Sequence, residues 1–564
     1  MNKYLIRGLV VAATGLSLAA GTSSCTKDLE QTPKYELTPD KVYVDLNGYR
    51  QVLAKLYGGF AVTGQTGPAG TAGSVNGPDI GGIDEGTSDY IRQYWSAQEL
   101  STDEATVVWN DLGIRDWHNM NWDASNPLIR GLYSRIYFEI AACNEFIRES
   151  SDDKISSRLA STDAASVKRF RAEARFLRAV SYMHALDLFG GGPFVTDNDA
   201  VGFAKPQYYT RQQMFTYVEQ ELTALAADPD FAEPRANEYS RVDKAAAWAM
   251  LARLYLNAQV YTGTARYSEA ATQAKKVIDA GYALNTAGAG AVASPYARLF
   301  LADNNTAPAR NEIIWPIAFD VNSTQSYGGT TFLVNGATGS SSLWQSRVGM
   351  STGWTGLRTT KNLFNLFQNP GGITSDTTRD TRGRFWVKKA DNSLRPLEIT
   401  DQYNFEEGYG VIKFRNVNSA GAAQGGAQNF SSVDFPMIRL AEVMLTYSEA
   451  VYRGGAGDKA LALKYVNDIR ARAFNGQPGS AVTDAQLTAN NFQFFLDERG
   501  RELFWEGYRR TDLIRFNKFV EGTYLWPFKG GTRDGRGVED FRKIYPIPAS
   551  DLAVNQNLKQ NPGY

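Results

Sequence analysis

Two polar stretches of the chain carry tryptophan and tyrosine rings beside amide and guanidinium groups. Flat rings stack on the apolar C–H faces of pyranose sugars, while amides, carboxylates and guanidinium groups bind the hydroxyls. The residues that could contact a sugar in this way are Trp109, Asn110, Arg115, Trp117, Trp122, Tyr327 and Trp344. The alternative for each ring is a hydrophobic plug under a long loop, and the sequence leaves the two interpretations equally open.

A second concentration of chemistry is a charged cluster near the C-terminal end of the sequence. It comprises Glu498, Arg499, Arg501, Glu502, Glu506, Arg509 and Asp512. Carboxylates four residues apart share one face of a helix, an arrangement that invites a catalytic interpretation. Arginines are interleaved with them, however, and Glu506 can pair with Arg510. We therefore interpret the cluster as a structural ion-pair network.

The remaining candidates for catalysis are weak, and we predict that the protein is not an enzyme. Glycoside hydrolysis requires two carboxylates about 5–10 Å apart. The doublets Asp103-Glu104 and Glu406-Glu407 could supply them, but doublets are expected by chance among 60 acidic residues. No constellation of residues meets the geometric requirements of an active site.

Histidine and cysteine are scarce, with two copies of each. A zinc site built on these residues is therefore nearly excluded, and no calcium-loop spacing is present, so no metal or cofactor is expected. Asp-rich loops leave a bound metal ion open as the alternative. Serine or cysteine catalysis would need His118, in a predicted loop, or His184, in a buried type of helix, and neither has a nucleophile motif nearby. Cys143 lies in an apolar helical pattern that predicts a buried, inert thiol. The formal net charge of -1 implies no basic face, so nucleic acid is not an expected partner.

The first residues have the layout of an exported lipoprotein. Lys3 and Arg7 precede an apolar, small-residue stretch over residues 8–21, which is too short for a comfortable membrane span. Small residues then lead to Cys25, as at a bacterial lipoprotein cleavage site. We expect residues 1–24 to be a signal peptide and Cys25 to carry a lipid anchor to the membrane. The alternative is an ordinary signal peptide followed by a chance cysteine.

Helical patterns dominate the elements that must position these residues. Apolar periodicity predicts helices over residues 41–60, 128–147, 165–189, 211–226, 242–260, 267–280, 437–453 and 458–473. One pair of these helices fits the first half of a tetratricopeptide repeat, through Trp248, Leu251, Ala252 and Tyr255. The sequence therefore predicts a scaffold of stacked helix pairs.

Two stretches interrupt this helical pattern. Residues 90–127 are polar and aromatic, and we interpret the part around the tryptophans as a loop. Residues 284–433 are rich in Gly, Ser, Thr and aromatics and contain strand-like runs at 312–317 and 384–387. A structureless loop of that length is uncommon in a compact domain, so we expect an irregular subdomain on the helical scaffold.

Five ordered motifs resemble the SusD/RagB family and extend over nearly all of the chain after the signal peptide. They include Tyr133-Ser134-Arg135-Ile136, Glu173-Ala174-Arg175-Phe176-Leu177, Ile438-Arg439-Leu440-Ala441-Glu442, Glu506-Gly507 with Arg509, and Asn561-Pro562-Gly563-Tyr564. Each motif alone is weak, but all five in order are highly specific. The resemblance implies a mainly α fold, the SusD-like α-α superhelix of tetratricopeptide-like helix pairs, with a large irregular subdomain of loops and short strands.

The resemblance also implies a function. Such proteins are lipid-anchored in the outer membrane, face the cell exterior and deliver oligosaccharide or polysaccharide to a SusC-type TonB-dependent transporter. They are not enzymes, and aromatic rings dominate their shallow glycan sites. Trp354 resembles a structural position of the family, and Trp315, in a strand-like run, is expected in the core. Alternatives are peptide or other nutrient cargo, a peptide-gripping tetratricopeptide adaptor, or a glycoside hydrolase.

These observations divide the chain into successive parts. After the signal peptide, residues 25–39 form the lipidated cysteine and a linker, and residues 40–283 form an N-terminal region of helix pairs. The irregular subdomain follows at 284–433, and a C-terminal helical region occupies 434–564.

Overall fold

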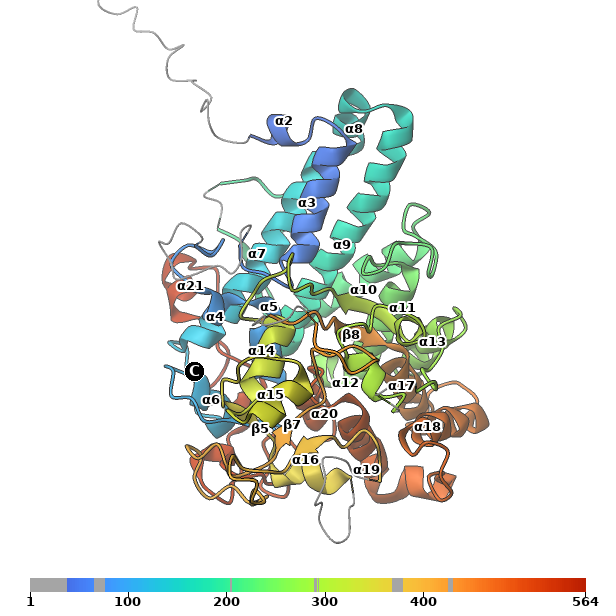
Figure 1. Cartoon of the computed structure of the whole chain (residues 1–564). Coiled ribbons are helices and arrows are strands. Elements are labelled where there is room, and N and C mark those ends of the chain that lie inside the picture. The colour runs from blue at the N-terminus through green and yellow to red at the C-terminus, as the bar shows by residue number, and fades with distance from the viewer. Residues whose placement is uncertain are drawn as a thin grey trace, which may run out of the picture.

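The structure, a computed structural model, describes residues 38–64, 77–202, 205–288, 292, 294–367, 379–424 and 430–564. The predicted signal peptide and Cys25 lie outside the described residues. Helices dominate, and within the described ranges no sheet has more than two strands (Figure 1). The predicted mainly α fold is thus confirmed. None of the helices described is both long and apolar enough to cross a membrane.

Long helices form one end of the molecule, at the top of Figure 1. They are α3 (Leu46–Gly58), α7 (Pro127–Glu149) and α9 (Ser161–Phe189), which pack on one another, with the short α2 (Pro39–Val42) and α8 (Asp152–Arg158). Asn126 starts α7 by accepting hydrogen bonds from the first free N–H groups of the helix. The second half of α9 is buried around its whole circumference, as its sequence predicts.

Stacked helix pairs continue the scaffold. They are formed by α10 (Arg211–Ala227), α11 (Lys244–Leu256), α12 (Ala258–Thr262), α13 (Tyr267–Ile278), α17 (Leu440–Tyr452) and α18 (Lys459–Ala473). α10 packs on α11, α11 on α13, α13 on α17 and α17 on α18. Ala270 and Ala274 on α13 are fully buried, because small side chains let the neighbouring helices approach closely. The predicted pairs are confirmed.

The irregular part of the chain is an excursion between two neighbouring helices of this scaffold. It lies between α13 and α17, which touch each other directly. β4 (Ile313–Ile317) and β8 (Phe435–Arg439) pair antiparallel. The chain therefore enters and leaves this irregular part through two neighbouring strands. Between them lie α14 (Gly329–Ala337), α15 (Ser342–Val348), β5 (Leu357–Arg358), α16 (Lys361–Leu366), β6 (Phe385–Trp386) and β7 (Gly410–Val411). The two strand-like runs are therefore confirmed as β4 and β6, and Trp315 on β4 is buried as expected.

The segment at 90–127 is more ordered than the predicted loop. It contains α5 (Tyr90–Trp95), the π-helical η2 (Ser96–Leu100), β1 (Thr106–Val107) and α6 (Ile114–Asn119), and the short α4 (Glu85–Ser88) precedes it. Each element has six residues or fewer, too few to show a period in sequence. His118 consequently lies on α6 rather than in a loop.

The remaining elements complete the described chain. They are β2 (Gly192–Phe194) paired with β3 (Gln207–Tyr209), η3 (Ala297–Phe300), η4 (Ala309–Asn311), α19 (Asp484–Leu503), α20 (Arg509–Arg515), η5 (Lys529–Gly531), η6 (Asp540–Lys543) and α21 (Ala549–Val554). α19 contains a kink at residues 489–492, where the backbone is not helical.

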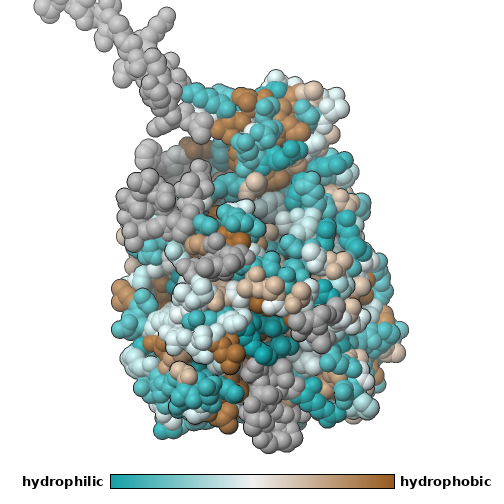
Figure 2. Space-filling view, viewed as in Figure 1, coloured by the Kyte–Doolittle hydropathy of each residue, from teal (hydrophilic) through white to brown (hydrophobic). Residues whose placement is uncertain are grey.

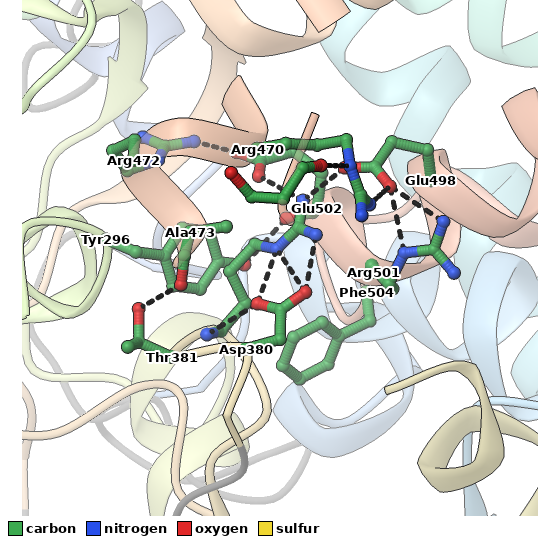
Figure 3. A network of polar contacts seen from close by, with 12 residues as sticks. Tyr296, Asp380, Thr381, Arg470, Arg472, Ala473, Glu498, Arg501, Glu502 and Phe504 are labelled. Carbon is green, nitrogen blue, oxygen red and sulfur yellow. Dashed lines mark hydrogen bonds and ion pairs between the residues drawn. The ribbon is translucent and has the colours of Figure 1, made fainter. Parts of the chain in front are cut away.

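Buried charges join α18 and α19 to the core (Figure 3). Arg382 contacts Glu498 at 2.8 Å and Glu502 at 3.0 Å, and Arg439 contacts Glu502 at 2.6 Å. These four side chains are wholly inaccessible to solvent. The prediction of a structural ion-pair network is therefore confirmed.

One pairing predicted within this network is wrong. Glu506 contacts Lys413 and Arg439, each at 2.6 Å, whereas Arg510 lies 3.5 Å from Asp187. The spacing of four residues brings side chains together only in a continuous helix. Here α19 ends at Leu503, and the chain turns through positive φ angles before α20 begins.

Candidate functional site

Three aromatic side chains from distant parts of the chain meet at one surface. The ring centroids of Trp109 and Trp354 are 6.4 Å apart, and those of Trp354 and Tyr327 are 6.2 Å apart. Trp109 and Trp354 are half-buried and Tyr327 is 42% exposed, so part of each side chain is open to solvent. Neighbouring rings are inclined by 49° and 57°, so the three rings do not lie in one plane. We call these three residues the aromatic arc.

A short strand pair fixes the two tryptophans. β1 pairs antiparallel with β5, and Trp109 follows β1 while Trp354 precedes β5. The indole Nε1 of Trp109 donates a hydrogen bond to the main-chain oxygen of Trp354 at 3.1 Å. Gly356 lies against the Trp109 ring, and a Cβ atom there would come within 2.2 Å of it. Only glycine allows this close approach of backbone and ring.

Two buried carboxylates hold the turn that carries Tyr327. Glu85 accepts hydrogen bonds from the Tyr327 main-chain N–H at 3.1 Å and from the Ser326 hydroxyl at 2.8 Å. Asp89 accepts one from the main-chain N–H of Gly329 at 3.2 Å. Burial raises the pKa of both carboxyls, that of Glu85 to about 7. The turn is thereby fixed to α4 and to the start of α5.

Arg92 places a cation beside the arc. It lies on α5, donates to the main-chain oxygen of Tyr327 at 3.3 Å, and its Cζ lies 4.7 Å from the ring centroid of Phe332. Asn110 is exposed directly after Trp109. The Arg92 guanidinium thus lies beside the ring faces of the arc, a combination that suits sugar recognition.

Arg115 supports the main chain at Trp109. Its Nε donates to the Trp109 oxygen at 2.8 Å, and its Nη2 donates to the Val108 oxygen at 2.7 Å. Of the residues expected from sequence, four lie at or next to this surface: Trp109, Asn110, Arg115 and Tyr327. Arg115 contributes by binding the main chain at Trp109.

Three of the expected rings are buried and do not line this surface, which corrects that part of the prediction. Trp117 and Trp122 are 0% and 1% exposed, and both pack on Tyr545. Trp344 is 2% exposed and stacks on Trp386 with a centroid distance of 5.0 Å. The residues that cover them come from remote parts of the chain, so the local sequence could not show the burial.

Two residues of this candidate site are not among the sugar contacts predicted from sequence. The sequence favours a structural position for Trp354, and the structure makes it the middle ring of the arc. Its flanking glycines, Gly353 and Gly356, were a usable signal, since they allow close backbone approach beside a ring. Arg92 gave no signal, because nothing in the sequence links α5 to the turn at Tyr327.

Both histidines of the chain lie in the core. No group of three or more His, Cys, Asp or Glu side chains in the described part of the chain could hold a metal ion. His118 and His184 are buried, and burial lowers their pKa to about 4 and about 3. His184 lies 2.8 Å from the Tyr90 hydroxyl, and His118 contacts the main-chain oxygens of Leu100 and Pro527. Both are core residues.

Known proteins share this sequence and fold. Residues 311–564 match the model of the SusD family, and residues 83–256 match a model described as starch-binding associating with outer membrane. The chain is 33% identical to the starch-binding protein SusD of Bacteroides thetaiotaomicron, over the full length of both chains. The chain belongs to the SusD family. The resemblance based on five motifs is thus confirmed.

Other relatives of this SusD family member are more distant. The SusD-like protein P25 of Formosa agariphila is 23% identical over 95% of both chains. A SusD-like protein structure from Bacteroides fragilis superposes with a TM-score of 0.65 at 19% identity, over 95% of this chain and all of that one. Surface glycan-binding protein A from Bacteroides fluxus superposes with a TM-score of 0.64 at 18% identity, over 92% of this chain and 99% of that one. These structures share the fold.

Proposed function

We propose that this SusD family member captures a glycan at the cell surface and passes it to a SusC-type TonB-dependent transporter. The observation that carries the capture step is the aromatic arc of Trp109, Tyr327 and Trp354. Three partly exposed rings, held by backbone hydrogen bonds and a glycine contact, form a platform for successive sugar faces. The family model described as associating with the outer membrane supports the location.

Starch is the first candidate glycan. The relative that is 33% identical over its full length is a starch-binding protein. The inclination of 49° and 57° between neighbouring rings fits a chain that curves, as α-1,4-linked glucose does, better than a straight ribbon. Both observations support an α-glucan over a flat β-linked polymer.

We further propose that the glycan is bound without being cleaved. Hydrolysis requires two carboxyl groups on either side of the glycosidic bond. The carboxylates beside the arc, Glu85 and Asp89, are buried and accept hydrogen bonds that hold a turn. Asp103 is buried against Arg509 at 2.7 Å, and Glu407 accepts the N–H of Asp401 at 2.8 Å. These acidic groups all have structural partners.

Lipidation at Cys25 and exposure to the cell exterior complete the proposal. Several acyl chains on one cysteine would hold the protein at the membrane without a spanning helix. The arc would then face the medium, where polysaccharide is available, and the transporter would receive the cargo from the anchored protein.

Affinity electrophoresis tests the capture step. The soluble protein, residues 26–564, is run in gels that contain soluble starch, hydroxyethyl cellulose, xylan or galactomannan, and each mixture is assayed for released reducing sugar. We expect retardation by starch, no released sugar, and loss of retardation in Trp109→Ala. Released sugar would mean that the protein is an enzyme. If no polysaccharide retarded the protein, glycan capture would be refuted in favour of peptide or other cargo.

A further inference from the structure

Tyr403 is an exposed ring that the aromatic arc does not include. It is 67% exposed, and among the described residues only Tyr327 is another aromatic residue with more than a third of its surface exposed. The Cζ of Arg115 lies 3.4 Å from the centre of the Tyr403 ring. One face of the ring is therefore covered by a guanidinium group, and the high exposure leaves the other face open to solvent.

Two buried arginines hold the loop that presents this ring. Arg358, which is fully buried on β5, donates to the main-chain oxygens of Gln402 at 2.6 Å and Glu407 at 3.0 Å. Arg395, 4% exposed, donates to the oxygen of Gly408 at 2.7 Å. Burial lowers the pKa of Arg358 to about 9 and that of Arg395 to about 10, so each guanidinium is held at an energetic cost.

Hydrogen bonds inside the loop and a stacking contact with a buried ring also hold the loop in place. The Glu407 carboxylate accepts the N–H groups of Thr400 at 2.6 Å and Asp401 at 2.8 Å, and Asp401 in turn accepts the N–H of Tyr403 at 2.8 Å. Phe405 stacks on the buried Trp344 with a centroid distance of 5.7 Å. An exposed loop with this many fixed bonds is rigid, so Tyr403 is presented in one position.

Arg115 connects Tyr403 to the arc. The same guanidinium that covers the Tyr403 ring donates to the main-chain oxygens of Val108 and Trp109. A single guanidinium group therefore separates the Tyr403 ring from the main chain of Trp109. Asn110, which follows Trp109 directly in the chain, is exposed.

We propose that Tyr403 forms an outlying subsite that stacks on a further sugar of the same glycan. This inference rests on the proposed function and extends it: the bound ligand is a chain long enough to cover the arc and reach Tyr403. A ring that is already immobilised by a cation loses little conformational freedom on binding, and its open face offers the surface that a pyranose requires.

Affinity as a function of chain length tests the inference. Binding of maltotriose and maltoheptaose is measured by isothermal titration calorimetry for the soluble protein and for Tyr403→Ala, Tyr403→Phe, Trp109→Ala and Leu394→Ala. Leu394 is a matched control, because it is another exposed hydrophobic side chain, 54% exposed, of the same irregular part of the chain. Thermal unfolding of each variant confirms that it is folded.

The expected results distinguish glycan binding at the arc from the outlying subsite at Tyr403. Tyr403→Ala should bind maltoheptaose about three- to tenfold more weakly and maltotriose unchanged, and Tyr403→Phe should restore binding, since the stacking face is kept. Trp109→Ala should weaken binding of both. If Trp109→Ala weakens both ligands while Tyr403→Ala behaves like Leu394→Ala, the outlying subsite is refuted and the proposed function stands. If the unaltered protein binds neither ligand, the starch proposal and this inference both fail.

Discussion

The indole N–H of Trp109 donates a hydrogen bond to the main-chain oxygen of Trp354 at 3.1 Å, and the two ring centroids lie 6.4 Å apart. The bond ties the side chain of one ring to the backbone that carries the other. The spacing of the two rings is therefore set before a ligand arrives, and little conformational entropy is lost on binding.

Replacement of Trp109 should separate binding from stability. Trp109→Ala removes a ring of the arc together with its hydrogen bond, and we expect at least about tenfold weaker starch binding. Trp344→Ala removes a ring that is 2% exposed and should lower the free energy of unfolding by about 3–5 kcal/mol. Because Trp109 is half-buried, its replacement should cost clearly less. Urea unfolding measures the stability of both variants, and equal losses would show that Trp109 is also a core residue.

Gly356 should control the arc without being part of it. In Gly356→Ala the added Cβ atom would lie 2.2 Å from the Trp109 ring, so the ring must move. We expect weaker retardation by starch although every ring is retained. Gly81→Ala is the matched control, because nothing lies within 4 Å of a Cβ atom at that position. Unchanged retardation in Gly356→Ala would show that the exact placement of Trp109 is unimportant for binding.

The sequence predicts the scaffold well because the apolar pattern within a long helix shows which of its faces are buried. The apolar circumference of α9 and the small residues of α13 are local patterns, and the structure matches both. Short elements give no such signal, so the sequence predicts a loop where α6 carries Trp117. The predicted pairing of Glu506 with Arg510 fails because α19 ends before Glu506.

The site was only partly predictable because the exposure of each ring depends on the three-dimensional fold. Trp109 and Trp344 stand in similar polar surroundings in sequence, yet one borders solvent and the other lies under the loop of Phe405. Segments far away in the chain decide which ring is covered. Figure 2 shows hydrophobic residues in separate patches on the side of the molecule that it draws.

Lipidation should determine where the protein resides. Cys25→Ala removes the only sulfur at the predicted cleavage site and should release the protein from the membrane fraction, with the fold unchanged. Cell fractionation without detergent measures the location, and circular dichroism confirms the fold. Replacement of the neighbouring Ser24 by Ala keeps a small residue before the cysteine and should leave the protein attached. Membrane attachment of Cys25→Ala would refute the lipid anchor.

Glu139 should make the protein more stable as the pH falls. It is 1% exposed on α7, and burial raises its pKa from 4.5 to about 8, although Arg135 acts in the opposite direction. The folded state therefore holds the proton more tightly than the unfolded state. This group's contribution to stability is fully present below pH 4.5 and is lost as the pH rises through about 8.

Glu139→Gln tests this contribution, because the amide stays neutral at every pH. We expect the variant to exceed the unaltered protein in free energy of unfolding by up to about 5 kcal/mol at pH 9, with the difference disappearing below pH 4.5. Urea unfolding across this range measures it. Glu145→Gln, on the same helix with a side chain 40% exposed, should have little effect at any pH. If Glu139→Gln were destabilising at pH 9 and less so at low pH, the Glu139 carboxylate would be ionised and paired in the folded protein.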